Sequence, residues 1–401
     1  MAADKPSTTG SPLEVLGAFF KLGVSAFGGP IAHLGYFRDE FVRRRAWLDE
    51  ASYADLVALC QFLPGPASSQ VGFAIGLKRA GPLGALAAWT GFTTPSAVLM
   101  IAFAYGAAAM TGRLALGAIH GLKLVAVAVV AQAVLGMART LTPDAKRAAI
   151  ALGAVAVVTF AWSAAAQILA IGLGALAGLV LCRESAGQVP EARAFRVSRA
   201  AGFAALAIFL VLLGGGPVLS ALTRSDAIAR FDAFYRSGAL VFGGGHVVLP
   251  LLQHAVVDPG WIGQDRFLAG YGAAQALPGP LFTFGAYLGA AMPTAPNGIA
   301  GGLLGLVAIF LPGLLALVAA LPFWGLLRAR AGAQAAMRGA NAAVVGILAA
   351  ALYNPLWTSA VLSPADFAIA AAGFVLLAAF RAPPIVVVAL GVAAGLGRAL
   401  L

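Results

Sequence analysis

The sequence predicts an all-α, polytopic membrane protein with two homologous halves of opposite orientation, whose helices break at Phe-Gly-Gly and Pro-Gly-Pro segments. Of its 401 residues, 61% are hydrophobic and 10% are charged, against roughly 25% charged in soluble domains. The 50 glycines suit membrane helices, whose backbones approach closely at small residues. Apolar stretches suited to a hydrocarbon core of about 30 Å recur along the chain, at residues 83–110, 114–137, 148–181, 201–213, 303–327 and 373–390.

The remaining composition excludes several classes of protein. The N-terminus carries no recognisable secretory signal, because residues 1–11 are polar and the first apolar segment contains Lys21 and a glycine pair. The net charge of +11 comes mostly from short loops between apolar stretches, which is typical of orientation signals rather than of nucleic-acid binding. Cys60 and Cys182 lie far apart in apolar segments and predict neither a disulfide framework nor a metal cluster.

The first half reads as a series of helices in which one pair is interrupted. A helix at 13–28 is followed by a basic amphipathic stretch at 36–47, which we expect to face anionic lipid headgroups. Two helices of about 14 residues, hence roughly 20 Å each, are too short to span alone; they lie at 51–63 and 66–79. Long helices follow at 84–110 and 114–139, and the apolar run at 148–181 reads as two short crossings.

The same order of motifs returns in the second half. Phe27-Gly28-Gly29 corresponds to Phe242-Gly243-Gly244, and Trp47 corresponds to Trp261. Gln61-Phe62-Leu63-Pro64-Gly65-Pro66 corresponds to Gln275-Ala276-Leu277-Pro278-Gly279-Pro280. The offset is 214 or 215 throughout, which indicates an internal duplication of the kind common in secondary transporters. We therefore predict an N-terminal repeat at 1–182, a linker with an added helix (201–214) at 183–225, and a C-terminal repeat at 226–401.

The distribution of lysine and arginine favours opposite orientations for the two repeats. Basic clusters lie at 38–45, 78–79 and 139–147, whereas their equivalents around 257–265, 292–298 and 356–366 hold no lysine or arginine. Orientation follows this bias in short loops. Three arginines fit the scheme less well, namely Arg113, Arg224 and Arg230.

The Pro-Gly-Pro elements are the sharpest candidates for a substrate site. Proline is tolerated at the first position of a helix, so Pro66 and Pro280 are placed to start a second half-helix whose free N–H groups favour an anion. Gly65 and Gly279 allow the bend. A plain kink or loop is the alternative, but two copies at equivalent positions favour a site. The polar candidates around these bends are Gln61, Ser68, Ser69, Gln70, Gln275 and Thr283.

The Phe-Gly-Gly segments, here called the glycine breaks, are the second candidate for the substrate site. Gly28, Gly29, Gly243 and Gly244 can expose backbone amides to a ligand or, alternatively, let another helix pack closely. They are not a dinucleotide fingerprint, because no strand precedes them.

Lys21 and Arg236 occupy equivalent places seven residues before the breaks. A cation inside an apolar helix costs at least about 2.5 kcal/mol at the membrane centre and is usually kept for a reason. Together they would place two positive charges near the repeat interface, apt for a divalent oxyanion; the alternative is that they extend to the membrane surface. Lys123 is a weaker candidate of the same kind, and Asn341 holds its place in the second half.

His33 and His246 lie just beyond the two breaks and could carry protons near neutral pH, although a lone histidine is more often structural. Asp55 and Asp232 are further candidates, yet each sits near a helix start where a carboxylate is favourable anyway. The sequence contains no catalytic triad, zinc-ligand spacing or Walker sequence, so we expect neither an enzyme nor a primary pump, and no metal or cofactor.

These motifs together resemble the chromate ion transporter family, in its long-chain, two-domain form. The resemblance rests on Phe27-Gly28-Gly29-Pro30-Ile31-Ala32-His33, Phe37-Arg38-x-Glu40-Phe41 and Gln61-x-x-Pro64-Gly65-Pro66-x-x-x-Gln70, with Phe242 to Gly245 and Gln275 to Pro280 in the second half. It covers nearly the whole chain. It implies a multi-pass protein of the bacterial inner membrane that exports chromate using the proton-motive force, with sulfate as competitor.

The two halves differ within this pattern. Phe284 stands where the first half has Gln70, and Gly245-His246 follows the second break where Pro30 follows the first. The halves are therefore expected to contribute unequally to binding.

The leading hypothesis is proton-coupled export of a tetrahedral dianion, most readily chromate. Sulfate or another oxyanion carried inward, a passive anion channel and a non-transporting scaffold are the alternatives. The partners expected are the oxyanion, protons and the bilayer, and a homodimer is a further hypothesis for which the sequence offers no argument.

Overall fold

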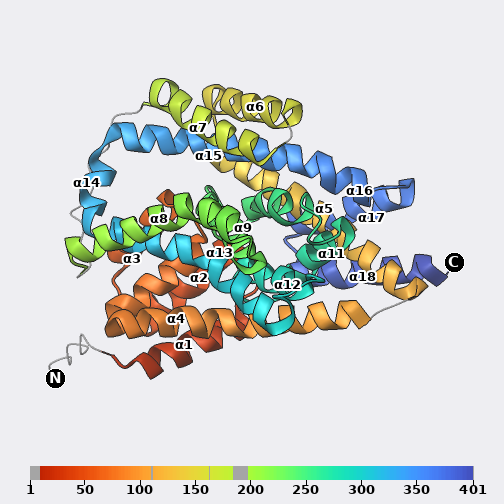
Figure 1. Ribbon diagram of the computed structural model, residues 1–401, viewed down its shortest axis with the longest axis horizontal. Coiled ribbons are helices and arrows are strands. Elements are labelled where there is room, and N and C mark those ends of the chain that lie inside the picture. Colours follow the sequence, from red (N-terminus) through yellow and green to blue (C-terminus); the bar gives the residue numbers. More distant parts are fainter. Residues whose placement is uncertain (1–9, 110–111, 162, 184–196, 401) are drawn as a thin grey trace.

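The protein is helical throughout the part of the chain that the structure describes. This computed structural model describes residues 10–109, 112–161, 163–183 and 197–400, and these contain helices and no strand (Figure 1). Five of the helices are long and apolar enough to cross a membrane, and several shorter apolar helices accompany them. The predicted membrane-protein class is thereby confirmed.

The described residues of the first repeat form seven α-helices and one π-helical segment. They are α1 (Pro12–Ser25), α2 (Gly29–Phe37), η1 (Arg38–Arg44), α3 (Glu50–Phe62), α4 (Ala67–Ala109), α5 (Arg113–Leu141), α6 (Ala145–Phe160) and α7 (Ala164–Leu181). The apolar run at 148–181 does form two short helices, as predicted. α4 is two helices that meet at a non-helical Ala80-Gly81 step, so a short helix after Pro66 is followed by a long one.

The second repeat follows an added helix, α8 (Arg199–Thr223). Residues 184–196 of the predicted linker lie outside the described residues. The remaining elements are α9 (Asp226–Ala239), η2 (Gly245–Val247), α10 (Val248–Leu252), η3 (Gln253–Val257), α11 (Gln264–Ala274), η4 (Leu281–Thr283), α12 (Phe284–Ala291), α13 (Gly298–Ala320), η5 (Leu321–Phe323), α14 (Trp324–Ala329), α15 (Ala331–Ala351), η6 (Leu352–Trp357), α16 (Thr358–Ala360), α17 (Pro364–Ala378) and α18 (Pro384–Leu400).

The first helices of the two repeats pack in the same way. On α1, the Cβ position of Gly23 lies 2.7 Å from the Gly91 carbonyl oxygen and 3.1 Å from Pro95 of α4. On α9, Gly238 lies against the Ile309 carbonyl and 3.1 Å from Pro312 of α13. A glycine therefore lets each first helix approach the backbone of the long helix of its own repeat, as small residues do in membrane interiors.

The terminal helix pairs are exchanged between the repeats. α5 packs against α17 and α18, whereas α15 packs against α6 and α7; Figure 1 shows α6 and α7 along α15 at one edge. Gly121 meets Gly391 in the first contact and Gly174 meets Gly339 in the second, each pair with backbone touching. α5, α6, α7 and α15 to α18 are here called the arm, and α1 to α4 with α8 to α13 are called the core; α11 of the core packs more extensively on α5 of the arm than on its core neighbours.

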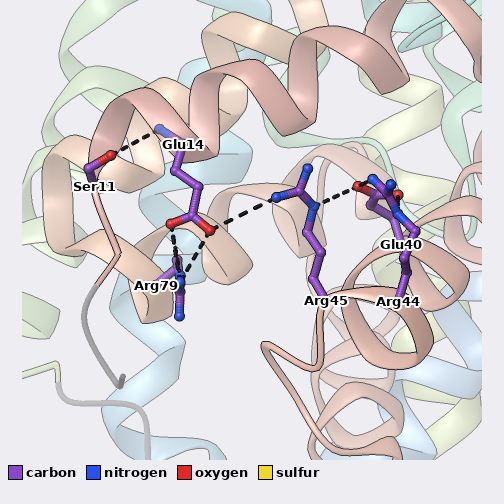
Figure 2. Close-up of polar contacts among 6 residues, drawn as sticks. All are labelled: Ser11, Glu14, Glu40, Arg44, Arg45 and Arg79. Atoms are coloured by element: carbon purple, nitrogen blue, oxygen red, sulfur yellow. Dashed lines mark hydrogen bonds and ion pairs between the residues drawn. The ribbon is translucent and has the colours of Figure 1, made fainter. Parts of the chain in front are cut away.

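An ion-pair network holds the basic segment after α2 to the core (Figure 2). Glu14 pairs with Arg79 at 3.1 Å and Arg45 at 3.9 Å, and Arg45 also binds Glu40 at 2.6 Å. Burial raises the pKa of Glu40, but hydrogen bonds from Arg44 and Arg45 outweigh it, so the net pKa lies below its ordinary value. The network fixes one end of the helix bundle; that this segment faces lipid headgroups stays a prediction.

Candidate functional site

Both Phe-Gly-Gly segments break the chain through glycines with positive φ. α1 ends at Ser25, and Gly28 (φ +103°) and Gly29 (φ +76°) turn the chain into α2. α9 ends at Ala239, and Gly243 (φ +72°) and Gly244 (φ +145°) precede η2. L-residues rarely adopt these angles, so the glycines are required by the backbone itself.

The Pro-Gly-Pro segments are non-helical in both repeats, with Gly65 at φ +113° and Gly279 at φ +91°. The expectation that proline occupies the first helical position is wrong by one residue: α4 begins at Ala67, and the Pro66 carbonyl accepts its first bond, from Gln70 N–H at 3.0 Å. Such shifts are common at helix ends. In the second repeat, Pro280 precedes a 3-10 turn rather than an α-helix.

Each Pro-Gly-Pro bend is bonded to the glycine break of the opposite repeat. Gly65 N–H donates to the Val241 carbonyl at 2.7 Å, and Gly279 N–H donates to the Ala26 carbonyl at 3.0 Å. The acceptors directly precede the two Phe-Gly-Gly segments, so the two bonds are related by the repeat. The breaks also approach each other, since the Cβ position of Gly245 lies 3.5 Å from Pro30. All four irregular segments therefore meet in one region.

The long helices enclose this region. The Cβ position of Gly65 lies 2.8 Å from Gly313 Cα on α13, and that of Gly279 lies 2.9 Å from Ser96 Oγ on α4. Ser96 and Gly313 each directly follow the proline in their long helix. Sequence reasoning missed both residues, although Pro95 and Pro312, each near the middle of an apolar stretch, were a signal that could have found them.

Gln70 holds its bend closed and has no amide hydrogen left to donate to a ligand. It is fully buried, and its Nε2 donates to the carbonyls of Pro64 (2.9 Å) and Gly313 (2.8 Å). Both amide hydrogens are thereby used. Thr283 is similar, because its hydroxyl donates to the Pro280 carbonyl at 2.9 Å.

The two serines behind Pro66 differ in their surroundings. Both are buried, at 2% and 3% exposure for Ser68 and Ser69. Ser68 Oγ lies 3.4 Å from His33 Nδ1, while Ser69 Oγ has no hydrogen-bond partner. A buried hydroxyl without a partner costs free energy, so Ser69 stays a candidate for a ligand contact.

The histidines connect the breaks to different elements. His33 Nε2 lies 3.2 Å from the Ala26 carbonyl and its Nδ1 faces Ser68, so its ring bridges the first break and the start of α4. A carbonyl can only accept, so Nε2 carries the proton and Nδ1 accepts from the serine. His246 Nδ1 instead lies 2.7 Å from the Tyr271 hydroxyl on α11. Tyr271 also interacts with Gln275, whose Nε2 has no partner.

The structure does not bring Lys21 and Arg236 to this region. Lys21 is exposed beside Phe20 and Val24, because Phe19, Leu22 and Gly23 take the face that packs on α4. Arg236 is 40% exposed and lies 3.9 Å from Asp232. The predicted pair of cations at the repeat interface is therefore not formed in this structure, and the alternative of outward-pointing side chains fits better.

Three other candidates have their own places in the fold. Asp55 accepts a hydrogen bond from Trp324 Nε1 at 3.0 Å, which ties α3 to α14. Lys123 is 8% exposed and pairs with Asp265 of α11 at 2.7 Å. Asn341 lies near Gly243, and its Oδ1 has no partner. Gln61 is exposed at the end of α3.

A cavity of about 430 Å³ lies away from the breaks, at the start of α11, where residues 260–266, Ala291 and Pro293 line it. The 11-residue α11 separates it from Gln275 by roughly 16 Å. The groups that meet at the breaks are backbone amides, hydroxyls and imidazoles. Such groups can bind an anion through hydrogen bonds and release it without forming a covalent bond.

Comparisons with known proteins agree with the duplication. The chain matches the family model described as "Chromate transporter" twice, over residues 13–179 and 228–396. It is 28% identical to a "Chromate transport protein" of Pseudomonas aeruginosa, over 96% of this chain and 91% of that protein. It is 28% identical to a "Probable chromate transport protein" of Synechococcus elongatus (76% and 75% covered) and 23% identical to a "Chromate transport protein" of Cupriavidus metallidurans (83% and 80%). No solved structure matches the chain.

Proposed function

The chain belongs to the chromate transporter family, and from this premise we propose that it is a secondary carrier that exports chromate across the bacterial inner membrane, driven by the proton-motive force. Inward transport of sulfate or another oxyanion, and passive conduction of anions, are the competing functions. Relatives named as chromate transport proteins align with most of the chain, which supports the first.

The observation that carries the proposal is the reciprocal bonding of the four chain breaks. The bonds from Gly65 to Val241 and from Gly279 to Ala26 bring irregular backbone of both repeats to one place. Irregular backbone inside a membrane is tolerated only where it is buried in protein or lines a watery cavity. Substrate sites of duplicated transporters lie at such repeat interfaces. We therefore place the oxyanion between the breaks, with Gly28, Gly29, Gly243 and Gly244 as its backbone contacts.

Neutral donors account for the binding of a dianion here. The first N–H groups of α4 lack helical partners and carry partial positive charge, and the Ser69 hydroxyl beside them is unsatisfied. A buried anion must be hydrogen-bonded, and these groups supply such bonds without a fixed full charge. This arrangement favours an ion that enters and leaves over one that is held permanently.

His33 offers a route for coupling to protons. In its neutral form Nδ1 accepts a hydrogen bond from Ser68. A second proton would make Nδ1 a donor, which would free the Ser68 hydroxyl to donate to an anion. Protonation and anion binding would then favour each other, as linkage requires for coupled transport. His246 and Asp55 remain the other candidates, but their contacts to Tyr271 and Trp324 do not reach the α4 start.

The test is counterflow in proteoliposomes. A carrier loaded with unlabelled chromate should accelerate entry of labelled chromate, whereas a pore should show no such stimulation. Sulfate should compete. Export coupled to protons further predicts that inverted vesicles accumulate chromate when a pH gradient is imposed and do not when it is dissipated. Accumulation of sulfate with no effect of chromate would favour the competing uptake function.

Opposite orientation of the repeats belongs to the same proposal. Arg43 and Asp258 are equivalent positions, related by the offset of 215, and their side chains are 63% and 46% exposed. In intact cells an impermeant thiol reagent should label Asp258→Cys and spare Arg43→Cys, because the basic segment belongs inside. Equal labelling of both positions would contradict the inverted arrangement.

A further inference from the structure

The two repeats make unequal contacts with the arm. α11 of the second repeat packs on α5. At this contact Gly272 lies directly against the Leu122 carbonyl, so closely that a Cβ would collide with it, and Leu268 is fully buried. Lys123 Nζ reaches Asp265 Oδ1 at 2.7 Å. The second repeat is therefore sealed against the arm by a close helix contact and a buried cation with its partner.

α5 also covers the second glycine break. The Cβ position of Gly243 lies 3.2 Å from Leu141 Cδ1 and 3.5 Å from Met137 Cε, two side chains at the end of α5. Because Gly243 and Gly244 belong to the proposed site, the same arm helix closes the site on this side.

No helix of the described part of the chain covers the equivalent surface of the first repeat. The offset of 214 relates the sealed face of α11 to one helical face of α3, and every residue of this α3 face is exposed: Ala51, Ala54, Ala58 and Gln61. The first break is open as well, since Gly28 is exposed and a Cβ on Gly29 would meet nothing within 4 Å. One side of the site is therefore closed and its repeat-related side is open.

The composition of the α3 face fits a helix contact better than a lipid surface. Its alanines allow a second helix to approach closely, as Gly272 does for α5. Other exposed helix faces include large apolar side chains, for example Leu169, Leu173 and Val180 on α7, whereas the three apolar positions of the α3 face are all alanine. The duplication also identifies the helix that would pack on this face of α3, because α15 is the counterpart of α5.

We infer that α5 and α15 are alternating gates, and that the structure is the state in which α5 seals α11 while α15 has left α3. In the other state α15 packs on the alanine face of α3, and the Lys123–Asp265 pair separates. This inference rests on the proposed carrier function, and with inverted repeats the two seals close opposite sides of the membrane. Ala51 and Asn341 stand where the first seal has Asp265 and Lys123, so the second seal lacks an ion pair.

The seal is tested by a reversible cross-link. In a background with Cys60→Ala and Cys182→Ala, the pair Lys123→Cys and Asp265→Cys is bridged with a short bifunctional methanethiosulfonate. Chromate counterflow should fall about tenfold or more, because the protein can no longer change state, and reduction of the bridge should restore it. Undiminished counterflow in the bridged protein would overturn the inference. The matched control bridges Glu14→Cys to Arg79→Cys inside the core (Figure 2), where counterflow should be unchanged.

The open face is tested independently of transport. Ala58→Cys should react with an impermeant maleimide in the substrate-free protein, and a saturating concentration of chromate should slow the reaction several-fold in the unbridged protein but not in the bridged one. A cysteine that does not react, or that reacts equally with and without chromate, would refute the alternating gates. Failure of the proposed function would look different, because the unbridged parent would then show no counterflow at all.

Discussion

Replacing Gly65 by alanine isolates the contact on which the site depends. Gly65 has φ +113°, and an alanine Cβ there would lie 2.8 Å from Gly313 Cα and 3.3 Å from Gln70 Nε2. The positive φ costs an L-residue about 1–2 kcal/mol, and forcing a methyl group against backbone costs about 1–3 kcal/mol more. If the bend moves, the loss of the 2.7 Å hydrogen bond between Gly65 and Val241 should add about 1 kcal/mol to the destabilisation.

Gly29→Ala is the matched control, because its φ is also positive (+76°) but its Cβ would meet nothing within 4 Å. Gly29→Ala should therefore lose only the about 1–2 kcal/mol of folding stability that the positive φ costs an L-residue. Thermal unfolding of the purified protein in detergent should therefore rank the parent above Gly29→Ala, and Gly29→Ala clearly above Gly65→Ala. Gly65→Ala should also lose chromate counterflow in the fraction that remains folded.

The second bend provides a rescue. An alanine at Gly279 would lie 2.9 Å from Ser96 Oγ, so Ser96→Gly should recover part of the stability that Gly279→Ala loses. If Gly65→Ala unfolds at the same temperature as Gly29→Ala, or if Ser96→Gly gives no recovery, the packing of the bends against the opposite long helices is wrong.

Three further predictions follow from single side chains. His33→Gln should keep chromate counterflow but lose its acceleration by a pH gradient, since Gln cannot take up the second proton; retained acceleration would move the coupling elsewhere. Lys21→Ala should leave counterflow within about twofold of the parent, as expected of an exposed side chain, and a larger loss would return Lys21 to the site. Glu40→Gln should lower the thermal stability at neutral pH, yet have little effect in acid: the pKa of Glu40 is lowered in the folded state, so its stabilisation is present above the ordinary pKa and is lost as the pH falls through the lowered value. Equal destabilisation by Glu40→Gln at both pH values would contradict the ion-pair network.

The helical class and the twofold repeat of the motifs were predictable from the sequence, because a duplicated run of glycine and proline signals is local. A positive φ at Gly28 or Gly65 is a property of a few neighbouring residues, and a duplicated motif doubles the signal. The outward direction of Lys21 was also within reach. Phe19, Leu22 and Gly23 follow the helical period of the buried face, and Lys21 falls outside it.

The exchange of the terminal helices was not predictable. Gly117 and Gly121 on α5 form a small-residue stripe that could pack on α7 of its own repeat or on α18 of the other, since both offer glycines at the same spacing. The structure has α5 on α18. That choice depends on contacts between segments hundreds of residues apart, and no local pattern contains it.

One difference between the repeats lies at the start of the helix that follows each Pro-Gly-Pro bend. Gln70 binds two carbonyls that close the first bend, whereas its counterpart Phe284 packs edge-on against Phe267 and Tyr271 on α11. The aromatic contact fastens the start of α12 to α11, and α11 is the helix that the arm seals. The first bend is fastened instead to α13, and α3 is held by its packing on α4 and by the hydrogen bond from Trp324 to Asp55. The repeat that holds its bend through a polar clamp is also the one whose α3 face is exposed, so the difference between the two bends coincides with one side of the site being open and the other closed.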